Sequence, residues 1–338
     1  MHIGVVYSLP SKRLAGTKYS QTDEDTGIIA QKVVLALDAL GHKTTTYVIS
    51  EENIEEILQI KADCIFNLIE WCGLDIHLSE RAFSYLRQLN IPITGSSEEL
   101  FVLTGDKIRT KQFLQKAKIP TPSGAFFTTG EEDIPDDLKY PVLIKTSLEH
   151  CSMGLGYDAI AHNREEVRPI VQRQIAQFEQ PVIAEEFIVG RELLVYLIEE
   201  QDQVKVLPIE EILFAGTNPL AFQTYESKWG GENGQALTTD VASDCQVAKL
   251  SESEQVVIEK VSVEAFKKLG LRGYARFDIR FKDNVPYILE TNANPSVYDG
   301  ENDLQDPSDE VIFGIKFIDY VRKILESALW HYQRGDVI

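Results

Sequence analysis

The sequence predicts a mixed fold, α/β over its first hundred residues and α+β over the remainder. Short apolar runs alternate with amphipathic helical segments up to about residue 94. Two prolines, Pro120 and Pro122, end that pattern, and strands that follow one another directly dominate the next part of the chain. A chain of 338 residues exceeds the roughly 250 to 300 residues that one hydrophobic core supports, so we expect two or three packed domains.

The first hundred residues predict a parallel sheet with helices on its faces. The expected strands are 3–8, 44–49, 63–69 and 91–94, and the expected helices are 26–40, 53–60 and 79–89. Asp25 or Thr26 would cap the first helix, and Gly41 follows its end. The polar loop 8–24 is longer than usual for a connection from a strand to a helix, and such loops at the carboxyl ends of parallel strands are often functional.

The rest of the chain predicts two further groups of elements, with prolines after the helix 106–117 marking the change. The first group is expected to contain strands 124–128, 141–145, 181–187, 191–199 and 204–209, with a helix at 164–178. The second is expected to contain helix 253–269, strands 273–281 and 287–292, and helix 310–329. These groups predict three domains, with residues 1–104, 105–212 and 213–338.

Composition and charge exclude several classes of protein. The chain carries 33 Lys+Arg against 53 Asp+Glu, a formal charge of −20, and no basic run that would attract a phosphate backbone, so we expect no nucleic-acid partner. No segment approaches the roughly 20 consecutive apolar residues that cross a bilayer, so we expect no membrane association. Met1 leads directly into an apolar run without a signal peptide, which predicts a cytoplasmic location. The four widely spaced cysteines predict reduced thiols.

The polar face of one predicted strand gives the strongest chemical signal. Positions 276, 278 and 280 are charged while 277, 279 and 281 are apolar, which is the period of a half-buried strand. A two-residue turn before the next strand would pair 282 with 285 and put Glu290 on the face opposite Asp278. A five-residue loop, 282–286, instead sets Asp278 opposite Glu290 and keeps Pro286 out of the ladder, so we favour the longer loop.

In that register Asp278, Glu290 and Asn292 present oxygen ligands from one surface, with Arg276 opposite Asn292. Such hard ligands suit Mg²⁺ or Mn²⁺. The alternative is a set of solvated surface charges, because charged side chains are mostly exposed. Three oxygen ligands and an arginine on matched faces favour the metal site.

The segments Gly-Tyr-Ala-Arg-Phe-Asp at 273–278 and Tyr-Ile-Leu-Glu-Thr-Asn at 287–292 resemble the metal-binding end of the ATP-grasp ligases, specifically the D-alanine:D-alanine ligase family. Further segments resemble the same family in the expected order: Asp106-Lys107 with Thr110-Lys111 after it, 119–122, 140–145 and 182–192. The resemblance covers nearly the whole chain. It implies an N-terminal parallel-sheet (pre-ATP-grasp) domain on the substrate side, a central ATP-grasp lobe with the adenine hinge, and a C-terminal ATP-grasp lobe with the metal site.

The resemblance assigns six residues to ATP. They are Lys107 and Lys145 for the phosphates, Glu185 for the adenine amino group, the Phe187 and Ile188 backbone for the purine edge, and Glu192 for the ribose. In the loop 146–156, Gly154 and Gly156 permit a close approach of the backbone to phosphate oxygens. The sequence has neither a P-loop nor a dinucleotide fingerprint.

The resemblance also implies four catalytic residues: Arg276, Lys228, Cys151 and Ser152. Lys228 resembles the lysine on a loop that folds over the γ-phosphate, and Cys151 stands where the family has a serine. Other departures touch the expected substrate pocket: the segment 22–27 lacks Val-Ser, 68–74 lacks His-Gly, Trp229 replaces a tyrosine, and Pro295-Ser296 replaces Pro-Gly. We therefore expect ATP and magnesium to be used with a different acid or amine.

The implied activity is an ATP-dependent carboxylate–amine ligase that joins amino acid-like substrates through an acyl phosphate. The alternative is a regulatory nucleotide-binding protein without turnover, which the intact Arg276, Asp278, Glu290 and Asn292 disfavour. An oxidoreductase is disfavoured by the missing glycine fingerprint. His77 and His150 have no partners at metal-ligand spacing, so we expect structural roles for them. A homodimer is compatible with these features.

Overall fold

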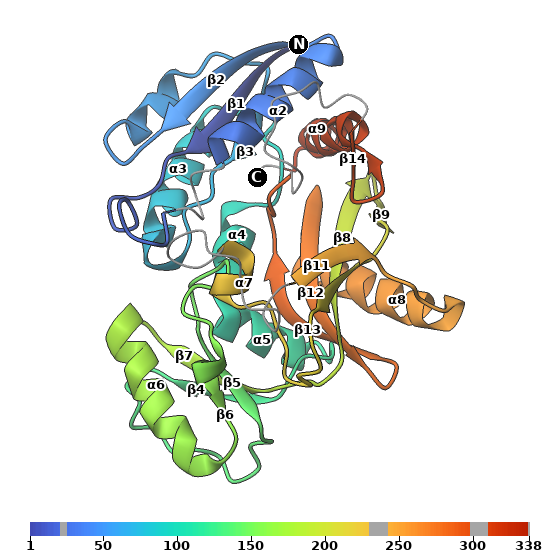
Figure 1. Ribbon diagram of the computed structural model, residues 1–338. Coiled ribbons are helices and arrows are strands. Elements are labelled where there is room, and N and C mark those ends of the chain that lie inside the picture. The colour runs from blue at the N-terminus through green and yellow to red at the C-terminus, as the bar shows by residue number, and fades with distance from the viewer. Residues whose placement is uncertain (21–25, 230–242, 298–309, 337–338) are drawn as a thin grey trace.

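The computed structural model describes residues 1–20, 26–229, 243–297 and 310–336. Its N-terminal part is a parallel sheet in the order β2-β1-β3, formed by β1 (His2–Ser8), β2 (Lys43–Ile49) and β3 (Cys64–Leu68) (Figure 1). The helices here are α2 (Thr26–Ala39) and α3 (Ile76–Gln88). The predicted alternation of strands and helices is confirmed.

Three details of this region differ from the prediction. The expected strand 91–94 is reduced to one bridge between Ile65 and Ile93. The expected helix 53–60 is the 3₁₀ helix η1 (Ile54–Gln59), and α3 begins three residues earlier than expected, after the short 3₁₀ helix η2 (Gly73–Asp75). α2 begins at Thr26, and the other cap candidate, Asp25, lies outside the described residues.

The central part is an antiparallel sheet with one covering helix (Figure 1). The strand order is β4 (Gly124–Phe127), β7 (Val182–Glu186), β5 (Val142–Thr146) and β6 (Ile160–Ala161), and the helix is α6 (Arg164–Phe178). Helices α4 (Glu98–Gly105) and α5 (Lys107–Lys116) lead into it. Asp106 caps α5 by accepting from the Ile108 and Arg109 N–H groups, so the helix predicted at 106–117 is confirmed.

The C-terminal part is a larger antiparallel sheet. Its order is β11 (Ser243–Val247), β10 (Glu210–Phe214), β8 (Arg191–Glu200), β12 (Tyr274–Lys282) and β13 (Val285–Asn292), with β9 (Gln203–Val206) also paired to β8. The strand predicted at 204–209 corresponds to β9, which ends three residues earlier than expected, and β10 was not predicted. This sheet takes strands from both sides of residue 212, while the division into domains at 104 and 212 stays a prediction.

The helices of this part are α7 (Tyr225–Trp229), α8 (Glu252–Leu269) and α9 (Phe317–Gln333). The helix predicted at 310–329 begins later than expected. Residues before it form the small hairpin of β14 (Val311–Ile312) and β15 (Ile315–Lys316), whose turn places Phe313 and Gly314 at positive φ. Such a turn cannot belong to a right-handed helix, so α9 starts at Phe317.

The β12–β13 hairpin has a shorter loop than predicted, but the side chains predicted to lie opposite each other do so. Lys282 pairs with Val285 across a two-residue turn, so the five-residue loop is wrong. A register shift between Asp278 and Ile279 compensates, because Ile279 faces Ile288 and Asp278 faces Glu290. Leu289 is the extra residue of this bulge, and Arg276 still lies opposite Asn292. β13 is the edge strand, which accommodates Pro286.

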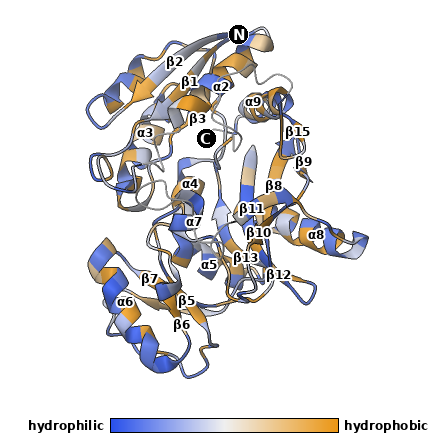
Figure 2. Ribbon diagram, in the orientation of Figure 1, coloured by the Kyte–Doolittle hydropathy of each residue, from blue (hydrophilic) through white to orange (hydrophobic). Residues whose placement is uncertain are grey.

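One hydrophobic core joins the N-terminal and C-terminal parts. It includes Ile29 and Val33 of α2, Tyr196 of β8, and Tyr320 and Ile324 of α9. α9 accordingly lies beside α2 in Figure 1. Figure 2 shows hydrophobic residues along the strands and hydrophilic residues over much of α6 and α8. No helix within the described ranges combines the length and apolarity needed to cross a membrane.

Candidate active site

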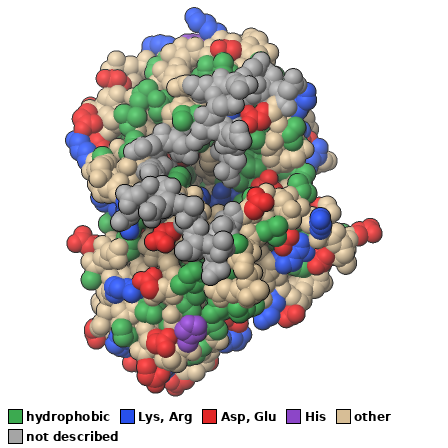
Figure 3. Space-filling view, in the orientation of Figure 1, with side chains coloured by type: hydrophobic (Ala, Val, Ile, Leu, Met, Phe, Trp, Pro, Cys, Tyr) green, Lys and Arg blue, Asp and Glu red, His purple; other side chains and the backbone are tan. Residues whose placement is uncertain are grey.

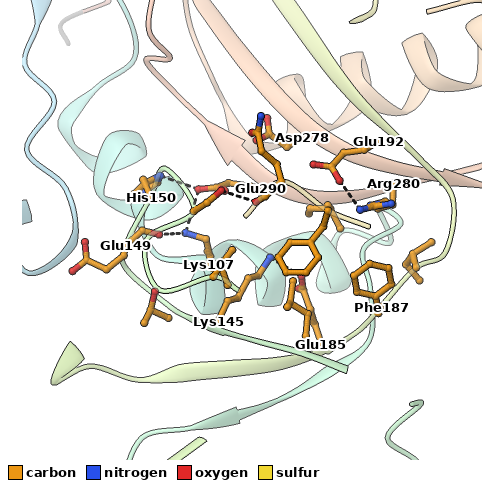
Figure 4. A pocket seen from close by; sticks show the side chains of 18 of the residues that line it. Lys107, Lys145, Glu149, His150, Glu185, Phe187, Glu192, Asp278, Arg280 and Glu290 are labelled. Carbon is orange, nitrogen blue, oxygen red and sulfur yellow. Dashed lines mark hydrogen bonds and ion pairs between the residues drawn. The ribbon is translucent and has the colours of Figure 1, made fainter. Parts of the chain in front are cut away.

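A cavity between the central and C-terminal sheets contains all six residues predicted to bind ATP (Figure 4). They are Lys107, Lys145, Glu185, Phe187, Ile188 and Glu192. Its empty volume is about 810 Å³, part of it open to solvent. Figure 3 shows the viewed face hollowed near its centre, with Lys and Arg side chains visible there. We call the cavity lined by these six residues the nucleotide cavity.

Lys145 and Glu185 line the nucleotide cavity and form a buried trio with Lys111, which is not one of the residues that line it. Lys145 lies opposite Ile183 in the β5–β7 ladder, which makes Glu185 its diagonal neighbour on the same face. Glu185 Oε1 lies 2.5 Å from Lys145 Nζ, and its Oε2 lies 2.8 Å from Lys111 Nζ. Lys111 was not among the predicted site residues, although the Thr110-Lys111 pair belonged to a segment that carried the resemblance.

The charges of this trio explain its pKa shifts. Burial raises the pKa of Glu185, but Lys111 and Lys145 more than offset burial and the pKa is lowered. Burial lowers the pKa of Lys145, but attraction to Glu185 more than offsets the effect of burial, so the pKa is raised. Burial lowers the pKa of Lys111 although Glu185 opposes the shift. Lys145 therefore stays positively charged at neutral pH, as its predicted contact with phosphate requires.

Lys107 is the first residue of α5, directly after the capping Asp106. Its Nζ donates to the Glu149 carbonyl and lies 3.2 Å from Glu290 Oε1. The Ser147 hydroxyl donates to Asp106 Oδ1 at 2.7 Å, which fixes the loop after β5 against the start of α5. Helix capping and loop anchoring thus bring the second predicted phosphate lysine to the same cavity.

Phe187 and Glu192 lie at the other end of the nucleotide cavity, around Arg280. The Arg280 guanidinium lies 5.1 Å from the centre of the Phe187 ring and 2.5 Å from Glu192 Oε2. It also donates to the Gly190 and Ala221 carbonyls. Burial raises the pKa of Glu192, which Arg280 only partly opposes. Arg280 was not a predicted site residue, although the charged face of its strand was recognised.

The predicted metal ligands lie on one face of the β12–β13 hairpin, each carboxylate beside a cation. Asp278 receives two hydrogen bonds from Arg276, at 2.7 and 3.1 Å. Glu290 Oε1 lies 2.8 Å from His150 Nδ1 as well as near Lys107. Burial raises the pKa of Glu290, but Lys107 and His150 more than offset it and hold the pKa well below its usual range. Glu290 is therefore ionised at neutral pH.

This donor set fits a hard cation. Asp278, Glu290 and Asn292 line one cavity, to which each can present a side-chain oxygen. Two carboxylates and an amide oxygen are ligands that Mg²⁺ uses while it keeps several waters. Within the described residues no three His, Cys, Asp or Glu side chains form a metal-binding group, so such a site rests on the two carboxylates and the amide.

A second, larger cavity adjoins the nucleotide cavity, and we call it the substrate cavity. It contains all four residues predicted to be catalytic: Arg276, Lys228, Cys151 and Ser152. The Trp229 indole donates to the Cys151 carbonyl at 3.2 Å, and the Ser152 hydroxyl donates to the Gln223 carbonyl at 2.9 Å. Burial raises the pKa of the Cys151 thiol, so it is protonated at neutral pH.

The two cavities meet at a shared set of residues. They are His150, Ser152, Met153, Gln223, Asp278 and Glu290. His150, for which we expected only a structural role, thus lies at this junction. Trp71, in the segment expected to touch the substrate, instead lies in the N-terminal core and donates to the Leu9 carbonyl. Its neighbours Glu70 and Cys72 line the substrate cavity.

Comparison with known proteins decides the family. The model of the family described as D-ala D-ala ligase C-terminus matches residues 113–325. The chain belongs to this family. A D-alanine–D-alanine ligase of Thermotoga petrophila is 29% identical over 311 residues, 91% of this chain and 92% of that protein. The uncharacterized protein y4sG of Sinorhizobium fredii is 29% identical over 284 residues, 80% of this chain and 79% of that protein.

Solved structures of the family share the fold. The D-alanine–D-alanine ligase of Bacillus anthracis matches with a TM-score of 0.75 and 21% identity over 99% of each chain. Its structure complexed with ATP matches with a TM-score of 0.72. The predicted ATP-grasp fold is confirmed. Family membership also confirms the predicted activity class, an ATP-dependent carboxylate–amine ligase releasing ADP and phosphate, over the non-catalytic alternative.

Proposed function

We propose that this ligase uses Mg²⁺ and ATP to activate a small amino acid-like acid and joins it to an amine. The observation that supports this most is the junction of the two cavities, where Asp278 and Glu290 line both. A nucleotide in one cavity and a carboxylate in the other would meet there. The nucleotide cavity contributes the cations Lys107 and Lys145, and the substrate cavity contributes Arg276 and Lys228.

In the nucleotide cavity we assign the phosphates to Lys107 and Lys145 and the ribose hydroxyls to Glu192. The Phe187 N–H already donates to the Pro141 carbonyl at 2.9 Å, so a backbone contact to the purine edge must come from the Phe187 carbonyl or from Ile188. Glu185 holds Lys111 and Lys145 in place, and its oxygens can accept a further hydrogen bond from the adenine amino group.

Asp278, Glu290 and Asn292 would hold Mg²⁺, or Mn²⁺ in its place. When bound, the cation neutralises phosphate charge that would otherwise repel an incoming carboxylate. Arg276 and Lys228 reduce the same repulsion from the substrate cavity, and Cys151 and Ser152 lie on the loop between the cavities.

The reaction follows from these charges. A substrate carboxylate oxygen attacks the γ-phosphorus, ADP leaves, and an acyl phosphate forms. The amine then attacks the acyl carbon, and the tetrahedral intermediate expels phosphate. The cations of the two cavities stabilise the negative charge that develops at each step. A cytoplasmic location is part of this proposal, while a homodimer and the absence of a nucleic-acid partner stay predictions.

The decisive experiment is an ADP-release screen with ATP and Mg²⁺ across D- and L-amino acids, small dipeptides and hydroxy acids. We expect at least one pair to release ADP, and Asp278→Asn or Glu290→Gln to abolish this turnover while circular dichroism shows an intact fold. Each change removes an anionic ligand from a cavity wall rather than from a packed core. Activity of both variants equal to the parent would remove the metal assignment.

A further inference from the structure

We propose that Arg13 is a positioning residue for the phosphate-binding loop, acting across the interface between the N-terminal and central parts through Glu149. This inference rests on the proposed function, because it takes the loop 146–156 to bind phosphate. Arg13 belongs to the long loop after β1, for which the sequence predicted a function but no role. Its partner Glu149 precedes the loop residues that separate the two cavities.

The contacts are specific on both sides of the interface. Arg13 Nη1 lies 3.3 Å from Glu149 Oε1, and Arg13 Nε lies 2.9 Å from Asp75 Oδ2. The Ser11 hydroxyl also donates to Asp75 Oδ2, at 2.6 Å. The side chain of Glu149 is only 1% exposed and that of Asp75 10%, while Arg13 closes over them from the surface at 33%. One guanidinium therefore bridges two carboxylates from different parts of the chain.

A glycine of the N-terminal part makes room for the same carboxylate. Gly73 has a φ of +62°, and a Cβ placed on it would lie 2.4 Å from Glu149 Oε2. The Glu149 side chain thus docks against the backbone of η2. Gln180 completes the arrangement by donating to Glu149 Oε1 at 2.9 Å while its own oxygen accepts from the Leu148 N–H.

The loop that Glu149 anchors is strained and has direct access to the nucleotide cavity. Cys151 and Ser152 both have positive φ, at 55° and 60°, which is costly for residues with a side chain. The Glu149 carbonyl accepts from Lys107 Nζ, a predicted phosphate ligand. Holding Glu149 therefore places both the lysine and the backbone that would face the phosphates. Loss of Arg13 would release one end of this arrangement.

The test compares ATP with adenosine. Because the loop would touch phosphates and not the purine, Arg13→Ala should weaken ATP binding about tenfold, equivalent to about 1.4 kcal/mol, and leave adenosine affinity within about twofold. Calorimetry with ATP and Mg²⁺, in the absence of acid substrate, measures both. Arg13→Lys keeps the positive charge but loses the planar guanidinium that contacts two carboxylates, so its ATP affinity should lie between those of Arg13→Ala and the parent. Lys12→Ala is the matched control, since Lys12 pairs with Glu52 at the surface.

A double-mutant cycle links the effect to Glu149. Arg13→Ala combined with Glu149→Gln should bind ATP no more weakly than Glu149→Gln alone, because the two residues act through one contact. Should Arg13→Ala fold poorly, Gly73→Ala moves Glu149 without removing a charge and should show the same selective loss of ATP. Equal ATP affinity in Arg13→Ala and the parent, or equal losses for ATP and adenosine, overturns the inference. Failure of the parent chain to bind ATP would instead overturn the proposed function on which it rests.

Discussion

At the scale of single residues, the neighbouring carboxylates Glu185 and Glu186 allow a buried ion pair to be compared with a surface one. Glu185 sits between two buried lysines, whereas Glu186 pairs at 3.4 Å with Lys139, whose side chain is 67% exposed. Glu185→Gln should cost about 3 to 5 kcal/mol of unfolding free energy because two buried ammonium groups lose their counterion. Glu186→Gln should cost less than about 1 kcal/mol. Urea denaturation of both variants checks this, and equal costs would contradict it.

A second prediction distinguishes the residue proposed to bind the ribose, Glu192, from one proposed to bind phosphate, Lys145. Glu192→Ala should bind ATP roughly tenfold to a hundredfold more weakly, the loss expected for a hydrogen bond to a charged group, and should no longer distinguish ATP from 2′-deoxy-ATP. Lys145→Ala should weaken both nucleotides alike, because it removes a phosphate contact only. Calorimetry with both nucleotides measures the ratio. Unchanged ATP affinity in both variants would remove the nucleotide-site assignment.

The site residues that the sequence predicted are those that belong to short ordered segments, such as Lys145 at the end of an apolar run. The residues that it missed depend on partners far along the chain. Lys111 of helix α5 has its counterion at Glu185 of strand β7, and His150 meets Glu290 only because β13 folds back beside the loop after β5. No local pattern records such a pairing, so these roles emerge only from the tertiary structure.

At the scale of elements, the β12–β13 hairpin shows why the residues that share a face of a hairpin can be predicted more safely than the length of its turn. Asp283 and Asn284 both have positive φ, at 49° and 60°, as a tight two-residue hairpin turn requires. That turn alone would have put Glu290 on the wrong face. The bulge at Leu289 corrects the register before the predicted ligands, so the polar face is preserved. Along β13 the alternation of buried and half-buried side chains is interrupted at Leu289 and Glu290, which are both half-buried.

The end of α9 carries a testable pH dependence. His331 Nε2 lies 2.7 Å from Glu199 Oε2, and its Nδ1 lies 3.0 Å from Asp336 Oδ2. Burial lowers the pKa of His331, but hydrogen bonds to Glu199 and Asp336 more than offset it and the pKa is raised above 6.5. Protonated His331 therefore stabilises the folded chain. This contribution is complete below about pH 6.5 and is lost as the pH rises through the higher folded-state pKa.

His331→Gln should accordingly reduce stability at pH 6 by about 2 kcal/mol, the order expected for lost charge-assisted hydrogen bonds. The difference between parent and variant should shrink by pH 9. Urea denaturation of both proteins across this range isolates the effect, because other titrating groups are common to the two. A difference that stays constant with pH would show that the pKa of His331 is the same in the folded and unfolded chain, which would contradict this prediction.

At the scale of the whole molecule, the substrate cavity is assembled from all three parts of the chain. Glu70 and Cys72 come from the N-terminal part, Cys151 and Ser152 from the central loop, and Arg276 with its neighbours from the C-terminal sheet. The shared core of α2, β8 and α9 holds the N-terminal sheet against the C-terminal one. The sequence predicted the order of these parts from the family resemblance. It could not show which departures from the family face the substrate, and Trp71 proved to be a core residue.

Two of the remaining departures bear on the choice of substrate. Cys151 and Trp229 line the substrate cavity in place of the serine and tyrosine expected from the family, and we predict that D-alanine alone is a poor substrate. Nearby serines are weak substitutes for the lost hydroxyl. Ser147 donates its proton to Asp106 and Ser152 donates its proton to Gln223, so either could offer a substrate only an acceptor.

A site that has lost a hydrogen-bonding partner discriminates by orders of magnitude, so D-alanyl-D-alanine should form at less than about 1% of the rate of the best pair found in the ADP-release screen. The double variant Cys151→Ser with Trp229→Tyr should raise D-alanine turnover while leaving ATP affinity unchanged, because both side chains lie on the substrate side of the junction. Incubation with ATP, Mg²⁺ and D-alanine, followed by mass spectrometry for the dipeptide, measures this. Efficient dipeptide formation by the parent chain at low millimolar D-alanine would contradict the prediction, since it would mean that thiol and indole satisfy the substrate as well as two hydroxyls do.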